Sequence, residues 1–209
     1  MTAGTDIAGA TSSSVAGITN SFRFTSGSET IEAMTASMQA ADTLLDSAAT
    51  GDTDVINILA TGAMNALTAV NIETANVNLA SGTPTAVLTN FSGLDNVNIT
   101  GNVAGTVTDA EAAMISLKNY TRVLTINETL IDGTTALANA DVTNITVSGL
   151  SHGLTTATRS GVTLTAGTDG ILETLNITSA GTAANDFTLD AGNNAVSYTH
   201  LTLPTTPYV

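Results

Sequence analysis

The sequence predicts an all-β protein, a parallel β-solenoid (β-helix) of short strands with one short helix near residues 109–119. Residues 72–79 show why, because an acidic residue is followed there by alternating aliphatic and polar residues. In a strand with this pattern, Ala75, Val77 and Leu79 point to one face. The pattern recurs at intervals near twenty residues, the length of one solenoid coil. One short strand cannot bury its apolar face alone, so the recurrence indicates stacking.

The composition is the second observation, and it favours strands and turns over long helices. Hydrophobic residues make up 43% of the chain and the mean hydropathy is +0.27, which argues against a disordered polyanion. Aromatic residues contribute only 3% and Trp is absent, so the core should be thin and aliphatic. Thr, Asn, Ala, Gly and Ser fill most of the remainder, as is typical of strands and turns.

The strand centres can be aligned along the chain at steps of 13 to 27 residues. Asn residues that recur at one position of a parallel solenoid are expected to stack as an amide ladder, although such a row could also bind a ligand. We predict the ladder for Asn76, Asn98, Asn144 and Asn176. The aligned centres are Asn57, Asn76, Asn98, Thr125, Asn144, Thr163 and Asn176.

Three regions follow from this alignment. Residues 1–21 are small and polar and form a lead-in or a first coil, and residues 22–195 form the solenoid repeat region. Within it, residues 108–111 (Thr-Asp-Ala-Glu) are a capping box followed by good helix formers, which predicts the short helix. Residues 196–209 look like the in-frame translation of a widely used transposase sequencing adapter. We therefore expect a non-native, artefactual tail there and exclude it from functional reasoning.

The charge excludes several partners. Four Lys and Arg face 18 Asp and Glu, which gives a formal net charge of −14 and a pI near 4.1. Nucleic acid binding depends on Lys and Arg, so we expect no nucleic-acid partner.

No apolar run approaches the ~18 residues of a membrane-spanning helix, so we expect no membrane insertion. Residues 1–10 do not resemble a signal peptide. Either the protein stays inside, or it leaves without an N-terminal signal, or Met1 is not the true start.

Three stretches together resemble a known group of proteins: residues 41–46 (ADTLLD), residues 51–58 (GDTDVINI) and residues 72–78 (IETANVN). They are similar to bacterial surface-layer proteins and to the large repetitive, RTX-like surface proteins related to them, over roughly residues 22–195. The resemblance implies an extracellular protein of the bacterial cell surface, exported without an N-terminal signal and often stabilised by calcium. It also implies self-association in a surface array or packing against neighbouring repeats of the same chain.

The acidic residues near Gly51 are the candidate metal ligands. Calcium takes six to eight oxygen ligands, largely from carboxylates and carbonyls. Asp42, Asp46, Asp52 and Asp54 are clustered here, so we name them as a possible calcium site. The paired glycines of RTX calcium turns are missing, and the alternative is that these residues are solvated acidic corners that keep the solenoid soluble.

The function we expect is structural and non-catalytic: a segment of an S-layer lattice or of an adhesin-like stalk. We name no catalytic residue. His152 lies in a Leu-Ser-His-Gly stretch that predicts a turn, and nothing marks a Ser and an oxyanion hole beside it. The alternative is a polysaccharide-active β-helix enzyme, a lyase or a hydrolase. Such sites need clustered acids with a cation, or paired carboxylates, usually beside aromatic platforms, and here Tyr120 and four Phe are scattered.

Overall fold

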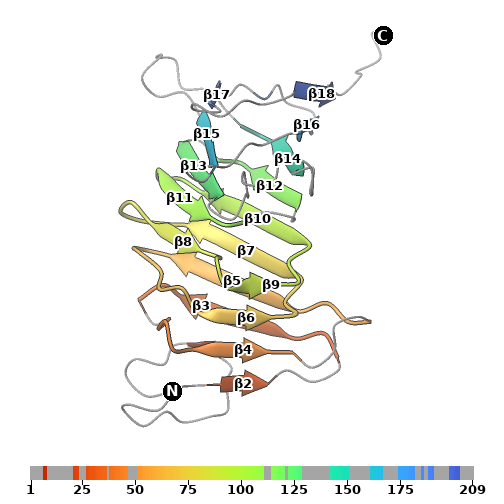
Figure 1. Cartoon of the computed structure of the whole chain (residues 1–209). Helices are drawn as coiled ribbons and strands as arrows, with labels where there is room; N and C mark the ends of the chain where they lie inside the picture. Colours follow the sequence, from red (N-terminus) through yellow and green to blue (C-terminus); the bar gives the residue numbers. More distant parts are fainter. Residues whose placement is uncertain are drawn as a thin grey trace.

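The chain folds as a parallel β-solenoid, in which successive coils stack along one axis (Figure 1). The computed structural model describes residues 7–8, 21–23, 27–36, 38–46, 51–110, 114–120, 122–128, 142–150, 161–166, 174–181, 185, 188–190 and 198–202. Their strands form three sheets, and neighbours within each sheet are parallel except at the N-terminal edge, where β1 is antiparallel to β3. The predicted fold class is therefore confirmed.

The main sheet runs the length of the solenoid and has nine strands in the order β1-β3-β5-β7-β10-β12-β14-β16-β18. Because this is also their order in the sequence, each coil adds one strand to the sheet beside the strand of the preceding coil. The strands are β1 (Ile7–Ala8), β3 (Thr30–Met34), β5 (Val55–Ala60), β7 (Thr74–Leu79), β10 (Asn96–Gly101), β12 (Met114–Lys118), β14 (Val142–Ser148), β16 (Thr174–Ala180) and β18 (Tyr198–Thr202).

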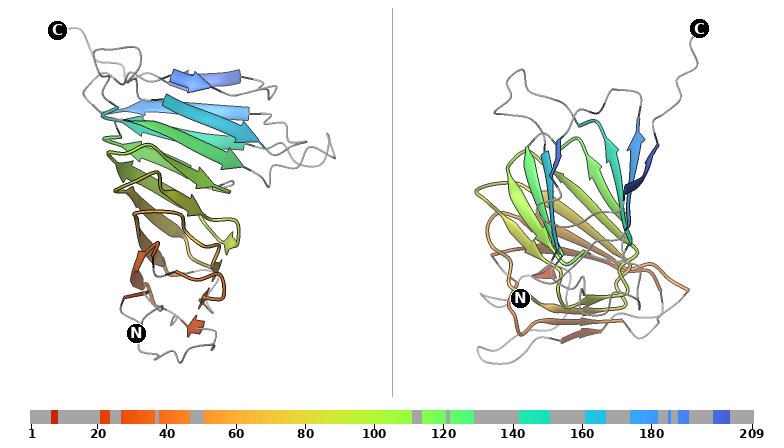
Figure 2. Two further views of the ribbon diagram at one scale, coloured as in Figure 1. Left: turned by 90° about the vertical axis from the view of Figure 1, so that its left-hand side faces the viewer. Right: turned by 45° about the horizontal axis from the view of Figure 1, so that its top comes forward.

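Two smaller sheets close the other sides of the coils. The four-stranded sheet contains β2 (Ser21–Arg23), β4 (Thr43–Leu45), β6 (Thr68–Val70) and β9 (Phe91–Ser92). The five-stranded sheet contains β8 (Thr85–Val87), β11 (Gly105–Thr108), β13 (Val123–Glu128), β15 (Gly161–Ala166) and β17 (Thr188–Asp190). The coil of β7, β8 and β9 contributes one strand to each sheet, so the closing wall changes there from the four-stranded to the five-stranded sheet. Figure 2 shows this stack from two further sides.

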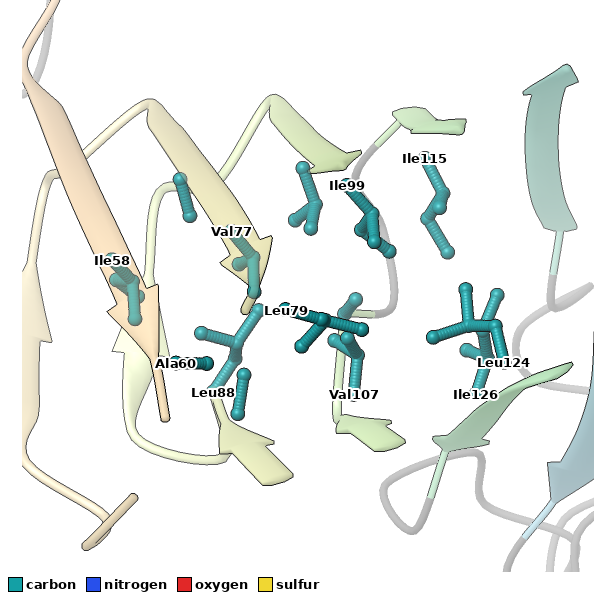
Figure 3. Close-up of a cluster of buried hydrophobic side chains, with 14 of the residues drawn as sticks. Ile58, Ala60, Val77, Leu79, Leu88, Ile99, Val107, Ile115, Leu124 and Ile126 are labelled. Atoms are coloured by element: carbon teal, nitrogen blue, oxygen red, sulfur yellow. The ribbon is translucent and has the colours of Figure 1, made fainter. Parts of the chain in front are cut away.

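The core is a column of aliphatic side chains between the sheets (Figure 3). On the main sheet, Ile58, Val77 and Ile99 are register partners, and each is at most 1% exposed. Val107 and Ile126, also register partners, approach them from the five-stranded sheet. Each fully buried side chain of this size contributes about 1.5–3 kcal/mol. Burial of every second side chain thus stabilises these segments as strands, because a strand places alternate side chains on opposite faces.

The helix predicted near residues 109–119 is wrong. Met114–Lys118 form β12, which is paired with β10 on one side and β14 on the other. Ile115 and Leu117 are buried while Met114 and Lys118 are exposed, which is the period of a strand. Asp109 has a φ of 57°, so the chain turns there instead of entering a helix. The described residues contain no helix, because pairing with two strands and burial of two aliphatics outweigh a local capping box.

The strand centres aligned from the sequence belong to two different sheets. Thr125 and Thr163 pair with each other on β13 and β15, in the five-stranded sheet, and they do not belong to the row of asparagines. Register partners on neighbouring strands of the main sheet lie between 18 and 32 positions apart in the sequence. The predicted repeat of nearly twenty residues therefore underestimates how much the coils differ in length. The longer coils have more residues between their strands.

The amide ladder is confirmed, but it consists of two ladders. Asn98 Nδ2 donates to Asn76 Oδ1 (2.8 Å), and Asn76 Nδ2 donates to Asn57 Oδ1 (2.7 Å). Asn176 Nδ2 donates to Asn144 Oδ1 (2.9 Å) in a second, separate row. The rows are offset because β12 pairs Ser116 with Asn98 but Met114 with Asn144. The two ladders therefore occupy outward columns that lie two residues apart.

The ends of the chain also contribute strands. Ile7–Ala8 pairs antiparallel with β3, and Tyr198–Thr202 pairs with β16 across a register shift at Leu175 and Asn176. The second of these strands lies in the segment predicted to be a non-native tail. Strand pairing does not report where a segment came from, so the origin of residues 196–209 stays a prediction.

Candidate metal centre

Three of the four candidate metal ligands lie together at one corner of the solenoid. Asp46 directly follows β4, Asp54 directly precedes β5, and Asp52 lies two residues before Asp54. One carboxylate oxygen from each of these three residues lies within 4.8 Å of the others. Asp42 is not in the group: its Oδ2 accepts a hydrogen bond from the Gln39 N–H (2.8 Å), which closes the turn before β4. We call Asp46, Asp52 and Asp54 the acidic triad.

Neighbouring coils hold the backbone of the triad on both sides. The Asp46 N–H donates to Val70 O (3.1 Å), in the next coil. The Asp54 carbonyl accepts from the Thr74 N–H (3.0 Å), also in the next coil. The Thr53 N–H donates to Ser28 Oγ (2.9 Å), in the preceding coil. The triad thus lies at corners that are hydrogen-bonded to the coils on either side.

The carboxylate of Asp54 is the most deeply buried of the triad, at 0% exposure. Its Oδ1 accepts the Glu29 N–H (2.8 Å), whereas its Oδ2 is buried and accepts no hydrogen bond. Burial is the main reason that the pKa of Asp54 rises from its ordinary value of 3.8 to about 6. The negative charges of Asp46, Glu29 and Asp52 act in the same direction, and the Glu29 hydrogen bond opposes them.

Asp52 adds further uncompensated oxygen ligands. Both of its carboxylate oxygens are buried and accept no hydrogen bond. Buried carboxylates that lack partners are costly unless a cation or a proton compensates them. Three carboxylates supply up to six oxygens, which matches the hard oxygen ligands that calcium prefers. The residues present therefore fit a divalent cation, and the acidic triad could hold one, while calcium binding itself stays a prediction.

The acidic residue of the sequence repeat has a structural role that the sequence did not reveal. Glu29, Asp54, Glu73 and Asp95 each immediately precede a strand of the main sheet. Each of their carbonyls accepts a hydrogen bond from the next coil. The bonds come from Val55 N to Glu29 (2.9 Å), Thr74 N to Asp54 (3.0 Å), Asn96 N to Glu73 (3.0 Å) and Met114 N to Asp95 (2.8 Å).

Two of these four side chains reach back to the preceding coil. Glu73 Oε2 accepts the Asp54 N–H (2.7 Å), just as Asp54 Oδ1 accepts the Glu29 N–H. Each of these carboxylates thereby satisfies a backbone donor at the corner of the coil before it. The recurrence of an acid directly before β3, β5, β7 and β10 is the signal that could have predicted this role. Glu29 and Glu73 also bring their charge close to the acidic triad.

Two further sequence predictions concern His152 and membrane insertion. His152 lies outside the described residues. Within the part of the chain that the structure describes, no helix is long and apolar enough to cross a membrane.

Comparisons of the chain with protein-family models, with curated proteins and with solved structures found no match. The strands and their pairing establish a β-solenoid and a corner where three carboxylates gather.

Proposed function

We propose that this chain is a structural segment of an extracellular bacterial surface protein, in which a β-solenoid extends or displays a surface and calcium holds one of its corners. The parent protein would be an S-layer lattice protein or an adhesin-like stalk. The segment would pack against neighbouring repeats of the same chain or against further copies in an array.

The acidic triad is the observation that carries the proposal. Three carboxylates converge there, and buried oxygens of Asp52 and Asp54 accept no hydrogen bond. A divalent cation would compensate both the mutual repulsion and the lost solvation. It would also join the end of β4 to the start of β5, so binding would stabilise a complete corner of the coil.

The proposed location follows from the affinity expected of such a site. Calcium sites of extracellular modules have dissociation constants of about 10⁻⁴ to 10⁻³ M, which suits the calcium concentration outside cells. An uncompensated triad would weaken the same fold where calcium is scarce. The net charge of −14 adds self-repulsion that divalent cations also relieve. Calcium would thus favour the folded solenoid after export.

The first test is unfolding of the purified protein in chelator and in about 10 mM CaCl₂. For dissociation constants in the extracellular range, we expect calcium to raise the free energy of unfolding by about 1.4–2.7 kcal/mol. Asp52→Asn should lose this response. Asp95→Asn is the matched control, because Asp95 occupies an equivalent corner outside the triad, and it should keep the response. A wild-type protein that unfolds identically with and without calcium would contradict the calcium part of the proposal.

The second test addresses location. An antibody raised against the folded protein should label intact cells of the bacterium that encodes it. Treatment of those cells with chelator should lower the labelling if calcium maintains the solenoid. Labelling that requires permeabilised cells would overturn the proposed surface location.

A further inference from the structure

The outer face of the main sheet carries a groove of about 420 Å³. It crosses the four neighbouring strands β3, β5, β7 and β10. At the usual spacing of about 4.8 Å between strands, it extends for about 14 Å along the solenoid axis. The lining residues are Glu32, Asn57, Ile58, Leu59, Asn76, Val77, Asn78, Asn98 and Thr100.

The first amide ladder forms one row of this groove. The ladder ends at Glu32, whose Oε1 accepts a hydrogen bond from Asn57 Nδ2 (2.6 Å). An asparagine amide has two N–H donors and two acceptor lone pairs, and the ladder bonds of Asn57, Asn76 and Asn98 use only some of them. The ladder therefore offers alternating donors and acceptors to a ligand, in an arrangement fixed by the stacked strands.

A second row lies beside the ladder, two residues further along each strand. Asn78 and Thr100 are register partners in this row, and both are exposed. Leu59, which is 36% exposed, precedes them in the same row and gives it an apolar surface. The groove thus combines polar groups that both donate and accept with a small apolar patch.

Charge restricts what could bind there. The groove lining contains one carboxylate, Glu32, and no Lys or Arg, and the whole chain has a net charge of −14. An anionic ligand would be repelled. The carboxylate of Glu32 already accepts the Asn57 amide at one end of the groove, so it does not form a cation site along its length. The lining is complementary to a neutral ligand.

We propose that this groove binds a segment of a neutral polysaccharide. Hydroxyl groups both donate and accept hydrogen bonds, so they match the mixed donors and acceptors of the ladder, Asn78 and Thr100. The C–H face of a sugar ring matches the exposed side chain of Leu59. Because the polar groups repeat at the strand spacing, the groove suits an extended chain that runs along the solenoid axis. This binding role goes beyond the structural role proposed above and does not depend on calcium.

The test is affinity electrophoresis of the folded protein in gels that contain a neutral polysaccharide. Dextran, hydroxyethyl cellulose and galactomannan are the three neutral probes, and polygalacturonate is the anionic one. We expect at least one neutral polymer to retard the protein, and polygalacturonate to leave its mobility unchanged. Retardation by none of the three neutral polymers, or by polygalacturonate alone, would overturn the proposal.

Variants locate the binding. Asn78→Ala combined with Thr100→Ala removes two groups of the groove without touching a ladder bond, and should weaken the retardation about tenfold. Thr100→Val is a gentler second variant that keeps the side-chain shape. Asn96→Ala lies on the same face outside the lining and should bind like the wild type. Equal retardation of the folded double variant and the wild type would place binding elsewhere and refute the groove.

Two controls separate this proposal from its rivals. Asp52→Asn should be retarded like the wild type, because the acidic triad is not part of the groove. Sedimentation velocity without polysaccharide tests whether this face instead closes against a second copy of the chain. Self-association that the double variant abolishes, in a protein that no neutral polymer retards, would replace the polysaccharide by a second copy.

Discussion

Replacing Asp54 by Asn tests the electrostatics of the acidic triad. The substitution keeps the shape of the side chain and leaves an Oδ1 that can still accept the Glu29 N–H, now 2.8 Å away. It removes the charge that burial disfavours, and its new amide N–H groups can donate to the carboxylates of Asp46 and Asp52. In chelator, we therefore expect Asp54→Asn to be more stable than the wild type at pH 8.

The magnitude follows from the pKa of Asp54. A rise from 3.8 to about 6, at about 1.4 kcal/mol for each pKa unit, corresponds to about 3 kcal/mol as an upper figure. Because the pKa in the folded state is the higher one, the folded protein binds the proton more tightly than the unfolded chain. The stability that the protonated Asp54 carboxyl contributes to the wild type should therefore be lost as the pH rises from about 4 through about 6. Above that pH, this contribution should no longer change.

The assay is urea unfolding between pH 4 and pH 8, in chelator and in calcium. Relative to the wild type, Asp54→Asn should lose the part of the pH dependence that lies between pH 4 and pH 6. It should also lose the stabilisation by calcium, so its advantage over the wild type should shrink when calcium is added. An Asp54→Asn protein that is less stable than the wild type in chelator at pH 8, or that keeps the full pH dependence, would refute the reasoning.

Three further substitutions test the solenoid itself, each by chemical unfolding. Asn76→Ala removes two ladder bonds and should lower the free energy of unfolding by about 1–3 kcal/mol. Asn78→Ala, beside the ladder, should lower it only slightly. Equal losses of stability in the two variants would show that the ladder does not stabilise the fold. Gly101→Ala should cost about 2–4 kcal/mol, because Gly101 has a φ of 141° and an added Cβ would clash with the Leu79 carbonyl. Gly62→Ala, with open space around it, is the control. Ile177→Asp would place a charge at a position only 5% exposed and should cost about 4 kcal/mol or more, while exposed Thr178→Asp should be tolerated. An unchanged unfolding midpoint for Ile177→Asp would reverse the assigned facing.

The sequence predicted the features that depend on alternation along one strand. Ile58, Val77 and Ile99 face the core, and the asparagines between them form ladders on the outer side, because a period of two leaves no other arrangement once one face is buried. The acid that recurs before several strands of the main sheet was visible as a pattern. Its role of accepting a backbone N–H from the preceding coil was not, because that bond joins residues 19 or 25 positions apart.

The wrong predictions share one physical cause. Pairing between coils decides whether a segment is a helix or a strand and which sheet it joins, and the local sequence pattern does not determine either. Thr125 alternates like Asn98, yet it belongs to a different sheet, and only its partner reveals which one. The capping box at residues 108–111 favours a helix locally, but β10 and β14 provide partners for β12 on both sides. Asp42, the fourth predicted ligand, accepts the Gln39 N–H outside the acidic triad, and its part in a metal site stays a prediction.

Direct calcium binding is the measurement that tests the central claim most closely. Isothermal titration calorimetry of the chelator-treated, dialysed protein with CaCl₂ at pH 8 should show saturable binding, with a dissociation constant of about 10⁻⁴ to 10⁻³ M. Asp52→Asn should remove that binding and Asp95→Asn should keep it. No saturable heat in the wild type, or the same heat in folded Asp52→Asn, would contradict a cation-stabilised corner in this solenoid.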